Sequence, residues 1–257
     1  MEILRDIEHR PWPLASKNWI MRQSWRNVLF VHYPVSSDRL RPYIPSCLEI
    51  DTYNGTAWLG VVAFMMKGIY PRGWSSLSLT PAFSEINVRT YVQFNGKPGV
   101  FFLSLDVNDW ASYTIAKRWY RLPYQRANIS YQQEGETFYF ESARKSTAAN
   151  SPISIQIKYT PISEVYVPKE GMLDHWLTER YCLFSSNNKG NIFCGEIHHQ
   201  PWPIQNVRAE INRNTLYTPF KIDNTNLQPL YHFSKGVDTL FWNIKRVRGT
   251  GTSAHLC

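Results

Sequence analysis

Polar and apolar side chains alternate along residues 84–92, and this segment carries the side chains best suited to chemistry. It reads Ser-Glu-Ile-Asn-Val-Arg-Thr-Tyr-Val. Successive side chains of a β-strand point to opposite faces, so the pattern predicts a strand with one polar and one apolar face. The polar face carries Glu85, Asn87, Arg89 and Tyr91. The apolar face, from Ile86 to Val92, is expected in a core.

These residue types suit the recognition of an acid and the transfer of a proton. An arginine binds a carboxylate through two parallel hydrogen bonds, and a positioned carboxyl group acts as general acid or base. On an isolated strand the polar face would meet solvent. In a barrel it would meet a polar lumen. The same alternation recurs at Tyr124, Arg126 and Asn128, and at Arg208, Glu210 and Asn212.

A barrel with a polar interior would gather these side chains into one pocket that binds a small anionic molecule. In this hypothesis Glu85 is the general acid or base and Tyr124 donates a hydrogen bond, which makes these two the candidate catalytic residues. Arg89 or Arg126 anchors the carboxylate of a small oxo-, hydroxy- or aromatic acid. Asn87 and Tyr91 complete the candidate binding residues. The structural alternative is that Glu85 and Arg89 pair with each other and hold the barrel together.

The elements that must position these residues are mostly strands. Asn-Gly between apolar runs is a strong hairpin signal, and it predicts hairpins over residues 48–66 and 85–106. Further strands are predicted at 28–33 (stopped by Pro34), 126–132, 137–142, 154–159, 191–198 and 204–212. Helices are predicted at 109–121 and 171–181, with one helical turn at 37–43.

Many paired strands with few helices predict a mainly β protein whose antiparallel sheet closes or nearly closes on itself. The length of 257 residues and the lack of a long linker favour one domain over residues 1–249. Residues 250–257 lack apolar periodicity and are expected to form a disordered tail.

Charge and targeting signals narrow the class of protein. The net charge is +8, but the basic residues are scattered, which argues against nucleic-acid binding. The sequence has neither a signal peptide nor an apolar run long enough for a membrane helix. We therefore expect a cytoplasmic protein with no membrane partner, and the sequence leaves a homo-oligomer open.

No metal or other cofactor is expected. His198 and His199 are adjacent on a predicted strand, so their side chains should point to opposite faces, and no third ligand stands at a suitable spacing. A disulfide is not expected in this compartment. Cys182 and Cys194 are instead expected to pack as small apolar side chains.

The chain resembles the YqjF-like family of uncharacterised bacterial proteins. The resemblance covers most of the chain from Trp25 to Val247 and rests on several segments. These are residues 51–62 (Asp-Thr-Tyr-Asn-Gly-Thr-Ala-Trp-Leu-Gly-Val-Val), 85–92, 99–106, 122–124 (Leu-Pro-Tyr), 177–181 (Leu-Thr-Glu-Arg-Tyr) and 198–203 (His-His-Gln-Pro-Trp-Pro). That family looks like a branch of the acetoacetate decarboxylase-like superfamily, which implies a cone-shaped antiparallel β-barrel with a ligand cavity.

The resemblance does not extend to the superfamily's nucleophile. The decarboxylase forms a Schiff base on a lysine whose pKa a neighbouring lysine lowers, and that pair follows a proline after a helix. Here Pro123 is followed by Tyr124-Gln125-Arg126. We therefore expect a small-molecule-binding protein, and one hypothesis is an enzyme that acts on a small oxo-, hydroxy- or aromatic acid without Schiff-base chemistry. The alternatives are a metabolite-binding protein without turnover and an interaction protein that uses exposed aromatic side chains.

Overall fold

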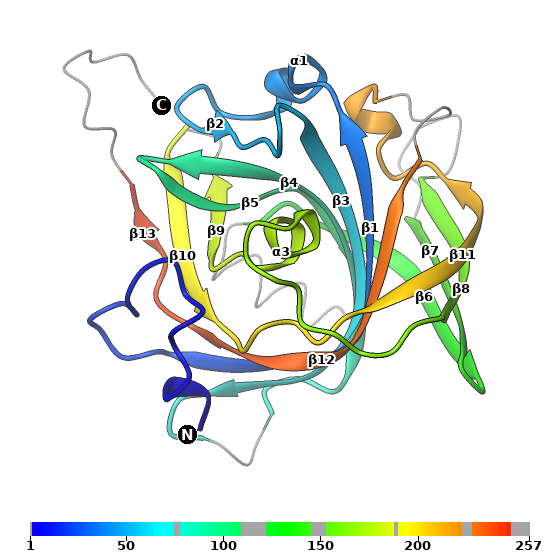
Figure 1. Ribbon diagram of the computed structural model, residues 1–257, viewed down its shortest axis with the longest axis horizontal. Helices are drawn as coiled ribbons and strands as arrows, with labels where there is room; N and C mark the ends of the chain where they lie inside the picture. Colours follow the sequence, from blue (N-terminus) through cyan, green and yellow to red (C-terminus); the bar gives the residue numbers. More distant parts are fainter. Residues whose placement is uncertain are drawn as a thin grey trace.

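The protein is mostly β-sheet in a computed structural model that describes residues 2–74, 78–108, 122–144, 153–187, 190–222 and 228–247 (Figure 1). The strands are β1 (Met21–Val35), β2 (Glu49–Ile50), β3 (Ala57–Pro71), β4 (Phe83–Phe94), β5 (Lys97–Val107), β6 (Tyr124–Glu134), β7 (Thr137–Arg144), β8 (Ser154–Pro161), β9 (Cys182–Ser186), β10 (Ile192–His198), β11 (Gln205–Asn214), β12 (Leu230–Phe241) and β13 (Lys245–Arg246). The α-helices are α1 (Ser37–Leu40) and α3 (Leu173–Thr178), and short 3-10 turns span Glu2–Leu4, Arg41–Tyr43 and Thr218–Phe220. Within this described part, no helix has the length and apolar character needed to cross a membrane.

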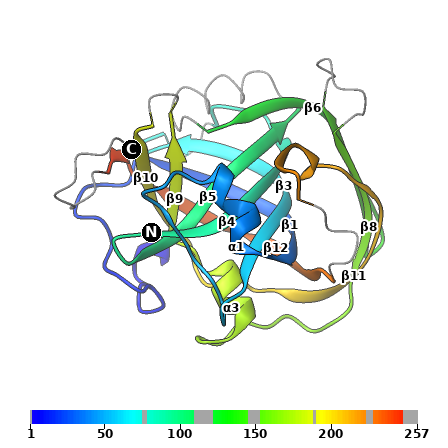
Figure 2. The ribbon, with the colours of Figure 1, turned by 90° about the horizontal axis from the view of Figure 1, so that it is seen from above.

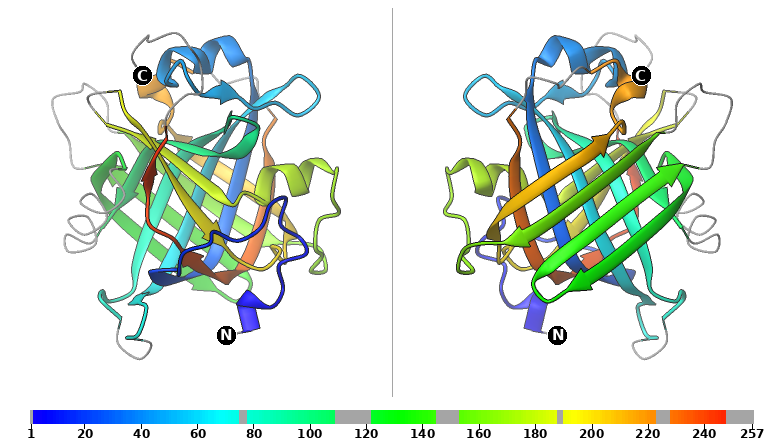
Figure 3. Two further views of the ribbon diagram at one scale, coloured as in Figure 1. Left: turned by 90° about the vertical axis from the view of Figure 1, so that its left-hand side faces the viewer. Right: turned by 90° about the vertical axis from the view of Figure 1, so that its right-hand side faces the viewer.

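The strands close into a barrel along two routes that share β12, β1, β3, β4 and β5. One route runs through β6, β7, β8 and β11, and the other through β9 and β10. Figures 2 and 3 show the strands of the first route forming a separate wall beside the shared strands. Every pair is antiparallel except β5 with β6 and β5 with β9, which are parallel. The predicted closed, mainly β architecture is confirmed, although the sheet is mixed rather than wholly antiparallel.

The shared strands have a buried cluster of side chains on each face. On one face, β4 places Tyr91 against side chains of β5, β10 and β12. On the other face, Ile86 and Val88 of β4 pack with side chains of β7, β8 and β11. Both faces of β4 are therefore buried, and its polar face points into the first cluster rather than to solvent.

A backbone irregularity in β1 and β12 decides which of their side chains face the first cluster. Asn27 has a φ of 52° and Gly236 a φ of 123°, and the pairing of β1 with β3 shifts between Arg26 and Leu29. A Cβ atom on Gly236 would lie 1.9 Å from the Trp25 carbonyl oxygen, so only glycine fits there. The bulge brings Trp25 and then Phe30 to the same lumen, although an unbroken strand would separate them.

The hairpin predictions have different outcomes. The hairpin over residues 85–106 is confirmed as β4 and β5, joined at Asn95 and Gly96 with positive φ values. At residues 54–55 the turn forms, but the flanking residues make only the Tyr53–Thr56 bridge. The preceding strand, β2, pairs with β4 instead of β3, so the prediction of a hairpin over residues 48–66 is wrong.

Two predicted boundaries also change. Pro34 does not stop β1, because the pairing of β1 with β12 ends at His32 and only β3 accompanies the strand beyond it. A proline is tolerated where its strand has an open edge. The helix predicted over residues 171–181 is shorter and spans α3 only. The helix predicted at 109–121 and the tail at 250–257 lie outside the described residues.

Cys182 and Cys194 form a disulfide between β9 and β10. The prediction that they pack as separate thiols is therefore wrong. Residues 182–186 carry no alternating pattern that predicts a strand, so the sequence does not indicate that the two cysteines lie side by side.

Candidate functional site

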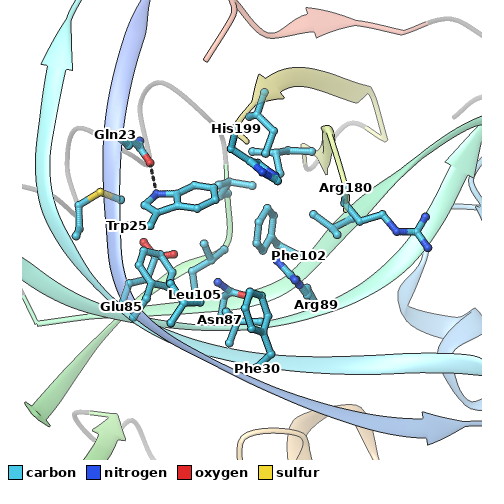
Figure 4. A pocket seen from close by; sticks show the side chains of 18 of the residues that line it. Gln23, Trp25, Phe30, Glu85, Asn87, Arg89, Phe102, Leu105, Arg180 and His199 are labelled. Carbon is cyan, nitrogen blue, oxygen red and sulfur yellow. Dashed lines mark hydrogen bonds between the residues drawn. The ribbon is translucent and has the colours of Figure 1, made fainter. Parts of the chain in front are cut away.

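A cavity lies inside the barrel, within the first of the two buried clusters. Its volume is about 70 Å³. An apolar cavity of about 150 Å³ is known to hold benzene, so this one suits a molecule of only a few heavy atoms. Much of its wall is aromatic or aliphatic, with Trp25, Phe30, Phe102, Leu105 and Trp202 among the lining residues (Figure 4).

The polar side chains of the cavity come from a few elements. Gln23 lies on β1, Tyr124 on β6, and the segment after Leu177 contributes Thr178 and Arg180. The polar face of β4 supplies the largest share, namely Glu85, Asn87 and Arg89, and His199 follows β10.

Glu85 is a buried carboxyl group held by neutral partners. It is 4% exposed, and the Tyr124 hydroxyl donates a hydrogen bond to its Oε2 at 3.1 Å. Burial raises the pKa of Glu85 to about 7, while hydrogen bonds from Tyr124 and Asn87 oppose the rise and the nearby Asp106 adds to it. A carboxyl group with such a pKa is present in both protonation states near neutral pH, as general acid–base catalysis requires.

Arg89 brings a positive charge to the same cavity without a carboxylate to balance it. It takes part in none of the ion pairs among the described residues. Its Nε is shielded from solvent and has no hydrogen-bond partner. The Tyr91 hydroxyl is close enough for the charge of Arg89 to oppose the rise in its pKa that burial causes, and the guanidinium lies 5.7 Å from the centre of the Phe30 ring. These partners are neutral, so the charge remains available to an anion.

The structure brings together four of the six predicted site residues, namely Glu85, Asn87, Arg89 and Tyr124. Tyr91 points to the same side but lies beyond the cavity wall, where its hydroxyl donates to the Leu177 carbonyl oxygen at 2.9 Å. Their roles in catalysis and binding remain predictions.

Arg126 does not join the cavity, which corrects the prediction that it lines the lumen. β6 accompanies β5 only up to the Val107–Arg126 pair and then leaves to pair with β7. At that point Arg126 is exposed to solvent. The predicted set of Arg208, Glu210 and Asn212 on β11 does not line the cavity either.

Sequence reasoning missed Arg180 and His199 as cavity residues. Both belong to segments that carry the family resemblance, but neither lies on a strand with an alternating pattern. Burial lowers the pKa of His199 to about 4, so its ring is neutral, and its Nδ1 lies 2.7 Å from the Gln200 carbonyl oxygen. His198 turns the other way, toward the Ile3 carbonyl oxygen at 2.6 Å, as the strand geometry predicts. No group of three potential metal ligands occurs among the described residues.

Comparison with solved structures identifies the fold as that of acetoacetate decarboxylase. The chain is similar to acetoacetate decarboxylase from Legionella pneumophila, with a TM-score of 0.61, 14% identity and 96% of each chain covered. It is also similar to the enduracididine biosynthesis enzyme MppR in complex with pyruvate, with a TM-score of 0.63, 12% identity, and 92% of this chain and 94% of that chain covered. At these identities the likeness concerns the fold alone.

Sequence comparison then gives the family. Residues 22–238 match the model of DUF2071, a family described as an uncharacterized conserved protein. The chain is 38% identical over 228 residues to the uncharacterized protein YqjF of Bacillus subtilis, covering 89% of this chain and 93% of that protein. The chain belongs to this DUF2071 (YqjF-like) family.

Proposed function

We propose that the protein binds a small carboxylic acid in the barrel lumen and exchanges a proton with it through Glu85. The observation that carries this proposal is Arg89, a cation that lines a mostly apolar cavity and has no acidic partner among the described residues. Removing a charge from water is costly unless a counter-charge or hydrogen bonds replace the lost hydration. A ligand carboxylate would supply both to Arg89.

The position of Glu85 supports catalysis rather than binding alone. Glu85 and Arg89 line the same cavity from one face of β4, with Asn87 between them, so the proposal places the carboxylate of the ligand at Arg89 and directs its other end toward Glu85. Its raised pKa lets it accept a proton from the ligand and return it near neutral pH. The Tyr124 hydroxyl fixes the orientation of the carboxyl group.

The cavity size favours one of the predicted ligand classes. At about 70 Å³ it suits a small oxo- or hydroxy-acid, whereas an aromatic acid would require side chains to move. Pyruvate and lactate are therefore suitable test ligands.

Binding of pyruvate and lactate, measured by calorimetry beside the neutral lactamide, tests the proposal. We expect the two acids to bind and lactamide to fail. Arg89→Met should weaken acid binding about thirtyfold, the value of one lost charge-assisted hydrogen bond of about 2 kcal/mol. Arg126→Met, which removes an arginine outside the cavity, should leave binding unchanged. Equal binding of acid and amide, or no effect of Arg89→Met, contradicts the proposal.

A second measurement separates an enzyme from a metabolite-binding protein. Exchange of the pyruvate methyl protons with deuterated solvent, followed by NMR, reports proton transfer at the carbon next to the carbonyl. We expect the protein to accelerate it and Glu85→Gln to abolish the acceleration while pyruvate still binds. Binding without exchange would favour a protein that holds a metabolite without turnover.

Schiff-base chemistry is not part of the proposal, because no lysine lines the cavity among the described residues. Treatment with acetoacetate and borohydride should therefore leave the mass of the protein unchanged. A single reduced adduct would contradict this prediction, and Lys117, which lies outside the described residues, would be the first position to examine.

A further inference from the structure

Two buried histidines with open hydrogen-bonding atoms lie close to Arg89. His32 on β1 is 0% exposed, and neither of its ring nitrogens has a hydrogen-bond partner among the residues that the structure describes. His232 on β12 is 4% exposed. Its Nε2 lies 3.3 Å from Asp174 Oδ1, and its Nδ1 has no partner. The two ring centres are 6.3 Å apart.

Strand pairing places His32 and Arg89 at the same level of the barrel. Gly60 on β3 pairs with His32 on one side and with Arg89 on the other. A Cβ atom on Gly60 would lie 3.3 Å from Arg89 Cγ and 3.4 Å from the His32 ring. The absence of a side chain at this position lets the two approach each other. His32 also stacks on Phe30, a cavity residue, with ring centres 5.9 Å apart.

The open atoms near the lumen form a set with donors and acceptors. It contains both His32 nitrogens, His232 Nδ1, Arg89 Nε and Asn87 Oδ1. Nearly all buried polar atoms in folded proteins have a partner, so several orphans in one place indicate a group that binds between them.

We propose, building on the proposed function, that Arg89 and His32 form the subsite for the carboxylate head of the ligand and that His232 positions His32. Arg89 supplies the permanent charge, and His32, which approaches Arg89 across Gly60, supplies an N–H donor. Asp174 accepts a hydrogen bond from His232 Nε2 and so fixes the tautomer of that ring. The bare Nδ1 of His232 can then only accept a hydrogen bond, so in this proposal it accepts from an N–H of His32 and orients that ring, and it does not contact the carboxylate. Glu85 and Tyr124 then face the other end of the molecule.

The charges around His32 predict how binding depends on pH. Burial lowers the pKa of His32 well below its ordinary value, and Arg89 on β4 and His232 on β12 lower it further. Tyr91 on β4 lies beside it as a neutral ring, and Asp174 is separated from it by His232. A carboxylate bound at Arg89 counters these effects and raises the pKa of His32, so binding takes up a proton. The affinity for an acid should therefore fall as the pH rises.

Calorimetry of pyruvate binding in buffers of different ionisation enthalpy measures this proton uptake. Glu85→Gln serves as the background, because Glu85 would also gain a proton beside an anion. We expect uptake to persist in Glu85→Gln and to disappear when His32→Phe is added. His32→Phe and His232→Phe should each weaken pyruvate binding about tenfold. His198→Gln, which alters a buried histidine outside the cavity, is the matched control and should bind normally.

The outcomes separate this subsite from the function on which it rests. Binding that depends on Arg89 but is unchanged in both phenylalanine variants overturns the histidine subsite and leaves the proposed function intact. Failure of wild-type protein to bind any small acid overturns both. Should a phenylalanine variant fail to fold, NMR of ¹⁵N-histidine-labelled wild-type protein gives the answer. Pyruvate must then shift the ring signals of two buried histidines that lactamide leaves unmoved, and unchanged signals contradict the subsite.

Discussion

Two arginines line the same cavity in opposite electrostatic situations. Arg180 forms an ion pair with Asp51, with NH1 2.6 Å from Oδ2, and its guanidinium lies 4.2 Å from the Trp176 ring centre. In Figure 4 it points away from the centre of the cavity. Arg89 has no acidic partner in the described part of the chain. The difference distinguishes an arginine that holds the wall together from one that is available to a ligand.

The pairing of Arg180 also explains why it is a poor candidate for ligand binding. Arg180 is 6% exposed, and Asp51 already balances its charge. An incoming anion would have to compete with an acidic partner that is part of the fold. Arg89 offers the same chemical group without that competition.

The largest expected effect is the loss of the Arg180 ion pair. Asp51→Ala leaves a buried guanidinium without its counter-charge, which should cost about 3–5 kcal/mol of unfolding free energy. Arg89→Met removes a charge that has no acidic partner, so its cost should stay below about 1 kcal/mol. Urea unfolding of both variants measures the comparison. Equal destabilisation would mean that Arg89 is also structural.

Glu85→Gln should change the dependence of stability on pH. The pKa of Glu85 is raised from 4.5 to about 7 in the folded protein. The contribution of protonated Glu85 to the free energy of unfolding is therefore fully present below about pH 4.5 and is lost as the pH rises through about 7. Glutamine does not ionise, so the variant keeps its stability as the pH rises. Above about pH 8 its free energy of unfolding should exceed that of wild type by roughly 3 kcal/mol. Unfolding curves at several pH values test this. Parallel profiles for the two proteins would show that Glu85 titrates normally.

Tyr124→Phe should have the smallest effect. It removes one hydrogen bond to Glu85, which is worth about 1 kcal/mol, and that bond stabilises the ionised carboxylate. The pKa of Glu85 should therefore rise further and move the pH profile of proton exchange upward. NMR titration of the Glu85 carboxyl carbon measures the shift, and a downward movement would contradict the assigned geometry.

The alternating pattern of β4 was enough to predict the main polar wall of the site. Glu85, Asn87 and Arg89 share one face in the structure, because a regular strand preserves a repeat of two. The confirmed hairpin at Asn95-Gly96 follows from the same local rules. The alternation could not decide between solvent and lumen, because that depends on whether distant strands close the sheet.

The missed and misplaced residues have a different physical origin. Arg126 follows the same alternation as Tyr124, but β6 changes its partner strand there, and no local signal in the sequence marks the change. Arg180 and His199 enter the cavity from segments next to α3 and β10, where side-chain direction does not follow a two-residue repeat. His32 lies on a strand whose repeat the bulge interrupts.

Gly236 therefore helps to determine which side chains of β1 face the lumen. A side chain there would collide with the Trp25 carbonyl oxygen, and the simplest relief would be to restore an uninterrupted repeat along β1. Every residue on one side of the break would then change faces, so that Leu29 and Val31 would replace Phe30 and His32 on the inner face of β1. The barrel could keep its strands and its apolar interior while losing its chemical character. A glycine outside the cavity lining thus controls which half of a strand's side chains the ligand would meet.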